Sequence, residues 1–224
     1  MENIGKVSHW VFHLGDTRLV VNSTTLMMTW VVIGLVLAFA LIATRGRAMV
    51  PGPWQQLAEF LVQTFRELVS EALGEAYEER YFPLICALFI FLLFCNWVGV
   101  FPGMEEPTKD INTTLGLGIM GFFIAHGTAI KAKGLKQYLK EYFEPMFFLM
   151  PLNVVGEVAK VISISFRLFG NVLGGSIIII VVTHLVYGLL LPPFLYGFFA
   201  LFVGTVQAFV FTMLTLVYIS VQIR

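Results

Sequence analysis

The chain has 224 residues, of which 58% are apolar and only 12% are charged, whereas soluble globular domains carry about 25% charged residues. A mean hydropathy of +0.85 excludes a water-soluble globule and predicts an all-α integral membrane protein with the lipid bilayer as its first partner. The formal net charge is zero, and no basic arm favours a nucleic-acid partner, so none is expected.

The polar N-terminal stretch, residues 1–22, cannot form the apolar core of a signal peptide and is expected to be an external segment. His9 and His13 are four residues apart, a spacing that can suit a metal on a helix. No third ligand accompanies them, so a polar surface segment is preferred and no metal site is predicted. The first membrane helix is expected from about Ser23 to Thr44.

Residues 53–80 have a mixed pattern, in which leucines and phenylalanines recur at helical spacing and glutamates fill the gaps. This pattern predicts an amphipathic helix on the cytoplasmic membrane surface. Pro53 suits its first turn, where a missing backbone N–H costs nothing.

The second and third membrane helices are expected at about Tyr81–Phe101 and Thr113–Ile130. Between them lies a short acidic loop that contains Glu105, Glu106 and Asp110.

Residues 152–191 and 194–223 are both longer than an upright membrane helix requires. As one helix, the first stretch would be about 60 Å long, twice the thickness of the hydrocarbon core. Pro192 and Pro193 are expected to end it. We therefore predict a single membrane domain of five membrane helices, the last two long, antiparallel and strongly tilted, plus the surface helix.

The distribution of lysine and arginine predicts the orientation. With the N-terminus outside and the C-terminus in the cytoplasm, nine of the 14 cations are cytoplasmic, three are external and two lie within the first long helix. The nine are Arg45, Arg47, Arg66, Arg80, Lys131, Lys133, Lys136, Lys140 and Arg224.

Arg167 lies deep inside the longest apolar run. A cation near mid-membrane costs from about 3 to more than 10 kcal/mol, so such a residue indicates ion handling. It belongs to a stripe at spacings of three and four: Lys160, Ser163, Arg167, Asn171 and Gly174. A matching line on the last helix contains Gln207 and Tyr218, and antiparallel packing would let Gln207 reach Arg167 or Asn171. Lys160 and Glu157 can also be read as a simple i,i+3 ion pair at the interface.

Three stretches carry a resemblance to a known family: SFRLFGN at residues 165–171, VQAFVF at 206–211 and LVYIS at 216–220. They resemble subunit a of the F-type ATP synthase, most strongly over about residues 145–222. An arginine followed by Leu-Phe-Gly-Asn within a long apolar helix is a specific pattern.

The resemblance implies a non-catalytic subunit without a cofactor that translocates ions, with the proton as the expected ion, through two aqueous half-channels. Its partners would be the ring of c subunits, the peripheral-stalk b subunits and, through the stalks, the soluble ATPase sector, in a bacterial cytoplasmic (inner) membrane. Arg167 would face the ring carboxylates, favour their deprotonation and block leakage between the half-channels. Asn171 and Gln207 would complete the ion-translocation site.

This chain departs from the family pattern at two positions where an ionisable residue is common, since they hold Ser176 and Ala200. The inlet therefore needs other groups. The half-channel candidates are His184, Ser176, Asn96, Glu105, Glu106, Asp110, Ser163 and Tyr218. His126, in the third membrane helix, ranks below His184.

Other readings stay open. A transporter or channel could use Arg167 to bind an anionic substrate, and it would need helices interrupted around Gly170, Gly174 and Gly175. A membrane enzyme is disfavoured, because the sequence contains no HExxH motif and no nucleophile elbow. The choice between proton and sodium depends chiefly on the ring and is not predicted.

Overall fold

The computed structural model describes residues 9–14, 17–45, 52–101, 103–143, 150–185 and 191–223. Within these ranges, five helices are long and apolar enough to cross a membrane, as predicted. They span Ser23–Thr44, Glu75–Val100, Ile111–Lys133, Met150–Leu185 and Leu191–Ile223. The orientation calculated from lysine and arginine remains a prediction.

A short β-hairpin precedes the first membrane helix. Strand β1 (His9–Leu14) pairs antiparallel with β2 (Thr17–Asn22). Asn22 then starts α1 (Ser23–Thr44), because its side-chain oxygen accepts hydrogen bonds from the backbone N–H groups of Thr24 and Thr25 at 3.1 and 3.3 Å. A polar segment without strands was expected here, since pairing between two short stretches leaves little trace in either one alone.

The surface helix is shorter than predicted. Helix α2 spans Pro53–Leu73 and ends at Gly74, whose φ of +83° suits a residue without Cβ. Residues 75–80, expected in the surface helix, instead form the first turns of α3 (Glu75–Trp97), which continues into a 3₁₀ turn at Val98–Val100.

Helix α4 (Ile111–Lys133) begins at Asp110, whose carboxylate accepts a hydrogen bond from the Asn112 backbone N–H at 3.0 Å. It ends at Gly134, again with a φ of +83°. A further short helix, α5 (Leu135–Phe143), follows, and it was not predicted from the sequence.

The two long membrane helices are present. Helix α6 spans Met150–Leu185. Its end was predicted at residue 191, and residues 186–190 lie outside the described ranges. The chain returns through α7 (Leu191–Gly197), a π-helical stretch at Phe198–Val203 and α8 (Gly204–Ile223). The double proline thus begins the last helix rather than ending the one before, because proline is tolerated in a first turn, whose N–H groups have no helical partner.

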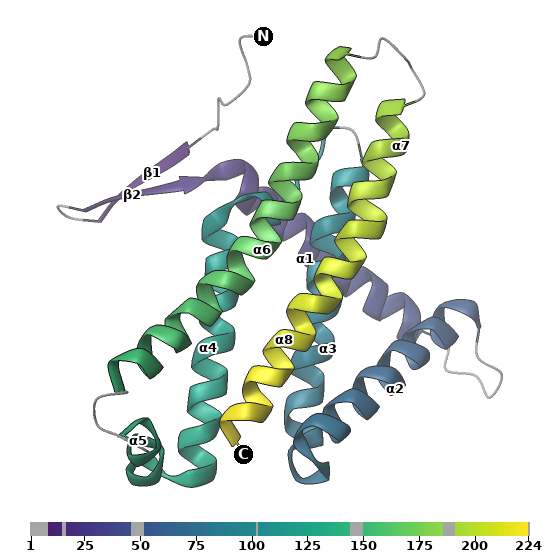
Figure 1. Cartoon of the computed structure of the whole chain (residues 1–224). Coiled ribbons are helices and arrows are strands. Elements are labelled where there is room, and N and C mark those ends of the chain that lie inside the picture. The colour runs from purple at the N-terminus through teal and green to yellow at the C-terminus, as the bar shows by residue number, and fades with distance from the viewer. Residues whose placement is uncertain are drawn as a thin grey trace.

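Figure 1 shows α6 and α7–α8 running antiparallel and obliquely across the more upright α3 and α4. Helix α5 and the C-terminal end of α8 lie at one end of the bundle. The C-terminal end of α6 and the N-terminal end of α7 lie at the other end. The main core joins α2, α3, α4, α6 and α8 around buried residues that include Leu92, Ala125, Leu168 and Phe211. Helix α1 is attached to α3 through a smaller cluster of Val32, Cys95 and Val98.

Helix α6 lies at the edge of this bundle. Only 17% of the most apolar 18-residue stretch of α6 is buried, compared with 56% of the corresponding stretch of α3. A broad apolar face of α6 is therefore open to lipid or to another protein.

Candidate functional site

Arg167 lies at the middle of α6, 17 residues after Met150 and 18 before Leu185. Its side chain is exposed on the face that α6 turns away from α4, together with Ser163 one turn before it and Asn171 one turn after it. Within the described part of the chain, no group forms a hydrogen bond or ion pair with this guanidinium. The cation is thus presented outward at mid-helix.

Gln207 of α8 reaches the neighbour of Arg167 rather than Arg167 itself. The Asn171 Nδ2 donates a hydrogen bond to the Gln207 Oε1 at 2.7 Å. The Gln207 side chain is buried, and its Nε2 has no hydrogen-bond partner among the described residues. A buried amide N–H group without a partner costs about 1–3 kcal/mol, so this side of the amide suits a water molecule or another hydrogen-bond acceptor.

A cavity of about 270 Å³, the loop cavity, lies between the 101–110 loop and the facing parts of α3, α6 and α7–α8. Charged and polar residues in its wall are Asn96, Glu105, Glu106, Lys109, Asn171, Ser176, Tyr196 and Gln207. Ala200 and Ser176, at the two positions where the resemblance implied an ionisable group, are both in this wall. The loop cavity therefore brings together four of the eight half-channel candidates, namely Asn96, Glu105, Glu106 and Ser176.

Glu106 provides a partly buried carboxyl group in the loop cavity. The carboxylate packs so closely against the 3₁₀ turn that a Cβ at Gly99 would overlap it. Burial raises the pKa of the Glu106 carboxyl above its ordinary value, and the nearby charge of Lys109 opposes this rise. Glu106 can therefore hold a proton at a pH at which fully exposed glutamates are ionised.

Asn96 has a second role that the sequence did not reveal. Its Nδ2 donates a hydrogen bond to the Gly204 carbonyl oxygen at 2.8 Å, and its Oδ1 accepts one from the Thr108 hydroxyl at 2.9 Å. Asn96 is buried, and its amide joins α3 to α8 and to the 101–110 loop. Asn96 therefore both lines the loop cavity and holds together the elements that form its wall.

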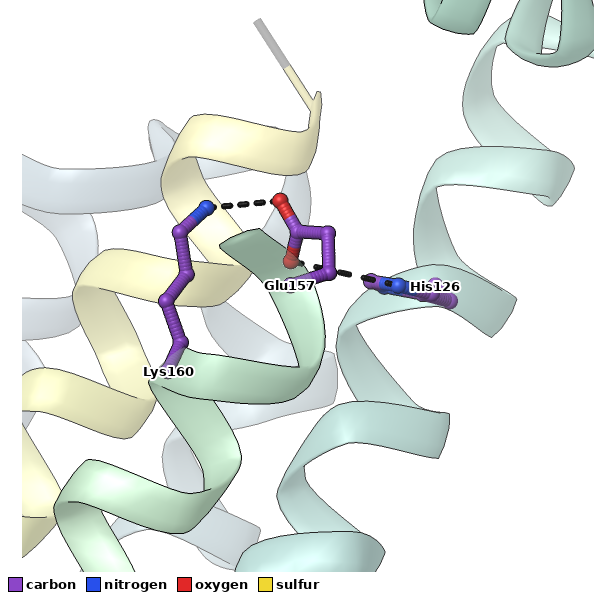
Figure 2. Close-up of polar contacts among 3 residues, drawn as sticks. All are labelled: His126, Glu157 and Lys160. Carbon is purple, nitrogen blue, oxygen red and sulfur yellow. Dashed lines mark hydrogen bonds and ion pairs between the residues drawn. The ribbon is translucent and has the colours of Figure 1, made fainter. Parts of the chain in front are cut away.

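A second cavity of about 280 Å³, the C-terminal cavity, lies between α4, α6 and α8. Its charged and polar lining residues include His126, Glu157, Lys160, Tyr218 and Gln222. Figure 2 shows Glu157 between Lys160 and His126. One carboxylate oxygen of Glu157 points towards the Lys160 ammonium group, and the other points towards the His126 ring. The Lys160 Nζ also lies 5.9 Å from the centre of the Tyr218 ring.

The two cavities are separated along both long helices. On α6, the lining of the C-terminal cavity ends at Ile164 and that of the loop cavity starts at Asn171, seven residues or about 10 Å further on. On α8, the corresponding residues are Thr215 and Gln207. Buried residues in this interval are Ser165, Leu168, Ala208, Phe211 and Thr212. Arg167 lies within the same interval, on the outer face of α6.

Other predicted residues lie outside both cavities. Asp110 caps α4 and accepts a hydrogen bond from the Thr25 hydroxyl at 3.2 Å, which ties α1 to α4. His184 is exposed near the end of α6, with its Nδ1 3.1 Å from the Ile180 carbonyl oxygen. Ser163 lies on the outer face beside Arg167.

The sequence analysis did not place the cluster of His126, Glu157 and Lys160 in its proposed site. A histidine inside a membrane helix was the available indication, but the contact between α4 and α6 could not be read from either helix. Among the described residues, no group of three His, Cys, Asp or Glu side chains is arranged to hold a metal ion.

Comparison with known proteins gives a consistent result. Residues 26–220 match the family model described as ATP synthase A chain. The ATP synthase subunit a of Moorella thermoacetica is 36% identical over 210 residues, covering 94% of both chains. The subunit a of Trichlorobacter lovleyi is 35% identical over 220 residues, which cover 96% of this chain and 91% of the relative. The subunit a of Acidothermus cellulolyticus is 36% identical over 221 residues, which cover 96% of this chain and 77% of the relative. This multi-pass integral membrane protein therefore belongs to the ATP synthase subunit a family.

Proposed function

We propose that this chain translocates protons in the membrane sector of a bacterial ATP synthase and that the loop and C-terminal cavities belong to two separate half-channels. The observation that carries this proposal is the position of Arg167, midway along α6 and between the linings of the two cavities. Family membership supports the same assignment.

Arg167 acts as a fixed charge at the surface of the rotor. An arginine stays protonated at any accessible pH, so it favours the ionised form of a carboxyl group that passes it. A ring carboxyl then releases its proton to one half-channel before it passes Arg167, and it takes up a proton from the other half-channel afterwards. A membrane potential of 100 mV supplies about 2.3 kcal/mol for each charge that crosses.

The same cation prevents a direct leak. A proton that moved straight from one cavity to the other would have to pass the positive guanidinium and the buried side chains around Leu168 and Phe211. A proton carried around on a ring carboxyl meets neither the guanidinium nor these buried side chains. Protons therefore cross only when the ring turns, which couples ion flow to rotation.

The loop cavity is the proposed inlet. Ser176 and Ala200 have no ionisable side chain, and Glu106 is the partly buried carboxyl in the same wall. We assign Glu106 as the proton-accepting group of the inlet, with Gln207 and Asn171 leading towards Arg167.

The open faces of α6 and α8 are the proposed contact with the ring of c subunits. Both helices carry exposed apolar residues, among them Phe166, which precedes Arg167 in the chain, and Phe209. Peripheral-stalk b subunits and the soluble ATPase sector complete the proposed assembly in the bacterial inner membrane, with the C-terminus in the cytoplasm.

Replacing Arg167 tests the function. Arg167→Ala in the assembled enzyme is expected to reduce proton-driven ATP synthesis to background, while the ring still co-purifies and the soluble sector still hydrolyses ATP. Synthesis is measured in inverted membrane vesicles energised by respiration. Arg66→Ala is the matched control, because it removes an exposed arginine paired with Glu78 at 2.6 Å on the surface of the bundle.

Wild-type synthesis by the Arg167→Ala enzyme would contradict the proposal. So would a purified chain that transports an anionic substrate in liposomes without the ring, which would favour the transporter reading instead.

A further inference from the structure

The C-terminal cavity contains a cluster of ionisable side chains from two helices. Glu157 Oε1 lies 2.6 Å from Lys160 Nζ, and Glu157 Oε2 lies 4.0 Å from His126 Nε2. Glu157 and Lys160 belong to α6, whereas His126 belongs to α4. Figure 2 shows the carboxylate directed at both partners.

This cluster lies mostly out of solvent. The side chains of His126 and Glu157 are only 15% and 18% exposed, whereas Lys160 is 40% exposed. The Phe122 ring lies 3.8 Å from the imidazole, centre to centre, and the Tyr138 ring of α5 lies 6.0 Å from it. Tyr218 of α8 lies in the same wall. A carboxylate and an imidazole in such surroundings are costly, and an ion pair between Glu157 and Lys160 alone would not require the histidine.

The arrangement suits transfer of a proton. Lys160 holds one carboxylate oxygen, so the other oxygen is presented to His126 and to the cavity. Imidazole has two ring nitrogens, and it can accept a proton on one and release a proton from the other. The 4.0 Å separation is longer than a hydrogen bond, so a small movement or a water molecule must complete the transfer.

We propose that His126 and Glu157 form the proton-transfer pair of the second half-channel, an inference that rests on the proposed function. A ring carboxyl that reaches this cavity loses its proton, and its O–H bond breaks as an O–H bond forms on Glu157. The proton then moves to a ring nitrogen of His126, and the imidazolium gives a proton to water at the end of the bundle where α5 and the C-terminal end of α8 lie. Glu157 and His126 return to their starting forms. Lys160 is a positioning residue that fixes the carboxylate.

The experiment measures passive proton conduction through the membrane sector. Inverted vesicles that contain the assembled enzyme are stripped of the soluble ATPase sector, and a potassium diffusion potential drives protons across. The variants are Glu157→Gln, His126→Gln, the double variant and Glu157→Asp. Glu78→Gln is the matched control, because Glu78 is also paired with a cation, Arg66 at 2.6 Å, but lies outside the C-terminal cavity.

Each glutamine variant is expected to lower the conduction rate at least about tenfold, and the double variant is expected to be no slower than the slower single variant, since both act on one pathway. Glu157→Asp should retain most of the rate because it keeps the carboxyl group. The dependence of the rate on pH should flatten in His126→Gln. Co-purification of the ring with each variant verifies assembly.

A purely structural role predicts different results. Glutamine is close to glutamate in shape and can still bond to Lys160, so Glu157→Gln would conduct normally if the carboxylate only braced α6. Normal conduction by Glu157→Gln and His126→Gln, or additive losses in the double variant, would overturn the pair. Failure of the proposed function is distinguishable, because it would appear as proton-driven synthesis by Arg167→Ala whatever the pair does.

Discussion

At the scale of single residues, several polar side chains in and around the membrane helices have a defined contact. Gln207 is paired with Asn171, Glu157 with Lys160, and Glu106 packs on Gly99 in the wall of the loop cavity. Arg167 differs from these residues, since within the described residues its guanidinium has no partner. An unpaired cation at mid-helix is expensive in lipid, so a partner on another chain explains it best.

Glu106 gives a prediction about pH. In the unfolded chain its carboxyl titrates near the ordinary value of 4.5, and in the folded chain its pKa is higher because of burial. Between these two values the folded chain binds more protons than the unfolded chain, so its free energy of unfolding falls as the pH rises. Glutamine does not ionise, so Glu106→Gln removes this fall in the free energy of unfolding. The variant is expected to melt at a higher temperature than the wild type well above pH 4.5, and at the same temperature below it.

Thermal denaturation of the purified full chain in detergent micelles measures this effect at both pH values. Glu105→Gln is the control, because the exposed side chain of Glu105 is already solvated in the folded state. An equal melting temperature for Glu106→Gln and wild type across the whole range would show that the Glu106 carboxyl is not desolvated.

At the scale of elements, Asn96 and Gly204 hold the last helix in place. The Asn96 amide satisfies the Gly204 carbonyl and the Thr108 hydroxyl, and a Cβ at Gly204 would lie 2.8 Å from the Asn96 Cβ. Helices α3 and α8 can therefore approach closely only with glycine at this position. The position of α8 in turn places Gln207 against Asn171.

Replacement of Asn96 by leucine is expected to weaken this junction. Asn96→Leu leaves the Gly204 carbonyl and the Thr108 hydroxyl without their partner, and each loss costs about 1–3 kcal/mol. The free energy of unfolding of the chain in detergent should fall accordingly. Gln137→Leu, which changes an exposed amide on α5, should change it by no more than about 0.5 kcal/mol. Equal effects of the two changes would exclude the junction as a stabilising contact.

At the scale of the whole molecule, the oblique pair of α6 and α8 gives the protein an open flank. Figure 1 shows the two helices crossing α3 and α4, which they use as support. The loop cavity and the C-terminal cavity lie between this pair and its support, and Arg167 lies on the opposite side of α6, towards the flank. This arrangement leaves Arg167 on the flank that the proposed ring would contact.

The orientation of the molecule is testable by reporter fusion. Nine of the 14 lysine and arginine residues predict a cytoplasmic C-terminus. Green fluorescent protein fused after the last residue should therefore fluoresce in cells, whereas alkaline phosphatase at the same position should be inactive. The reverse pattern would exchange the inlet and outlet assigned to the two cavities.

Much of the fold could be predicted from the sequence because membrane helices need about 20 apolar residues, and this requirement is local. The five membrane helices and the long final pair follow from it. Two boundaries were wrong for local reasons: Gly74 ends α2 before residue 80, and Pro192 and Pro193 open α7. The hairpin and α5 were missed because short elements depend on contacts that no single stretch contains.

The amino-acid sequence by itself determined the membrane helices, the mid-membrane position of Arg167 and the family resemblance, because apolar length and a single out-of-place charge are properties of one stretch of chain. Only the tertiary structure decided which polar residues meet. Asn96 bonds to residues 12 and 108 positions away, and Glu157 faces a histidine on another helix. Such contacts depend on how tilted helices cross, and the crossing is fixed by packing between helices rather than by the order of residues within one.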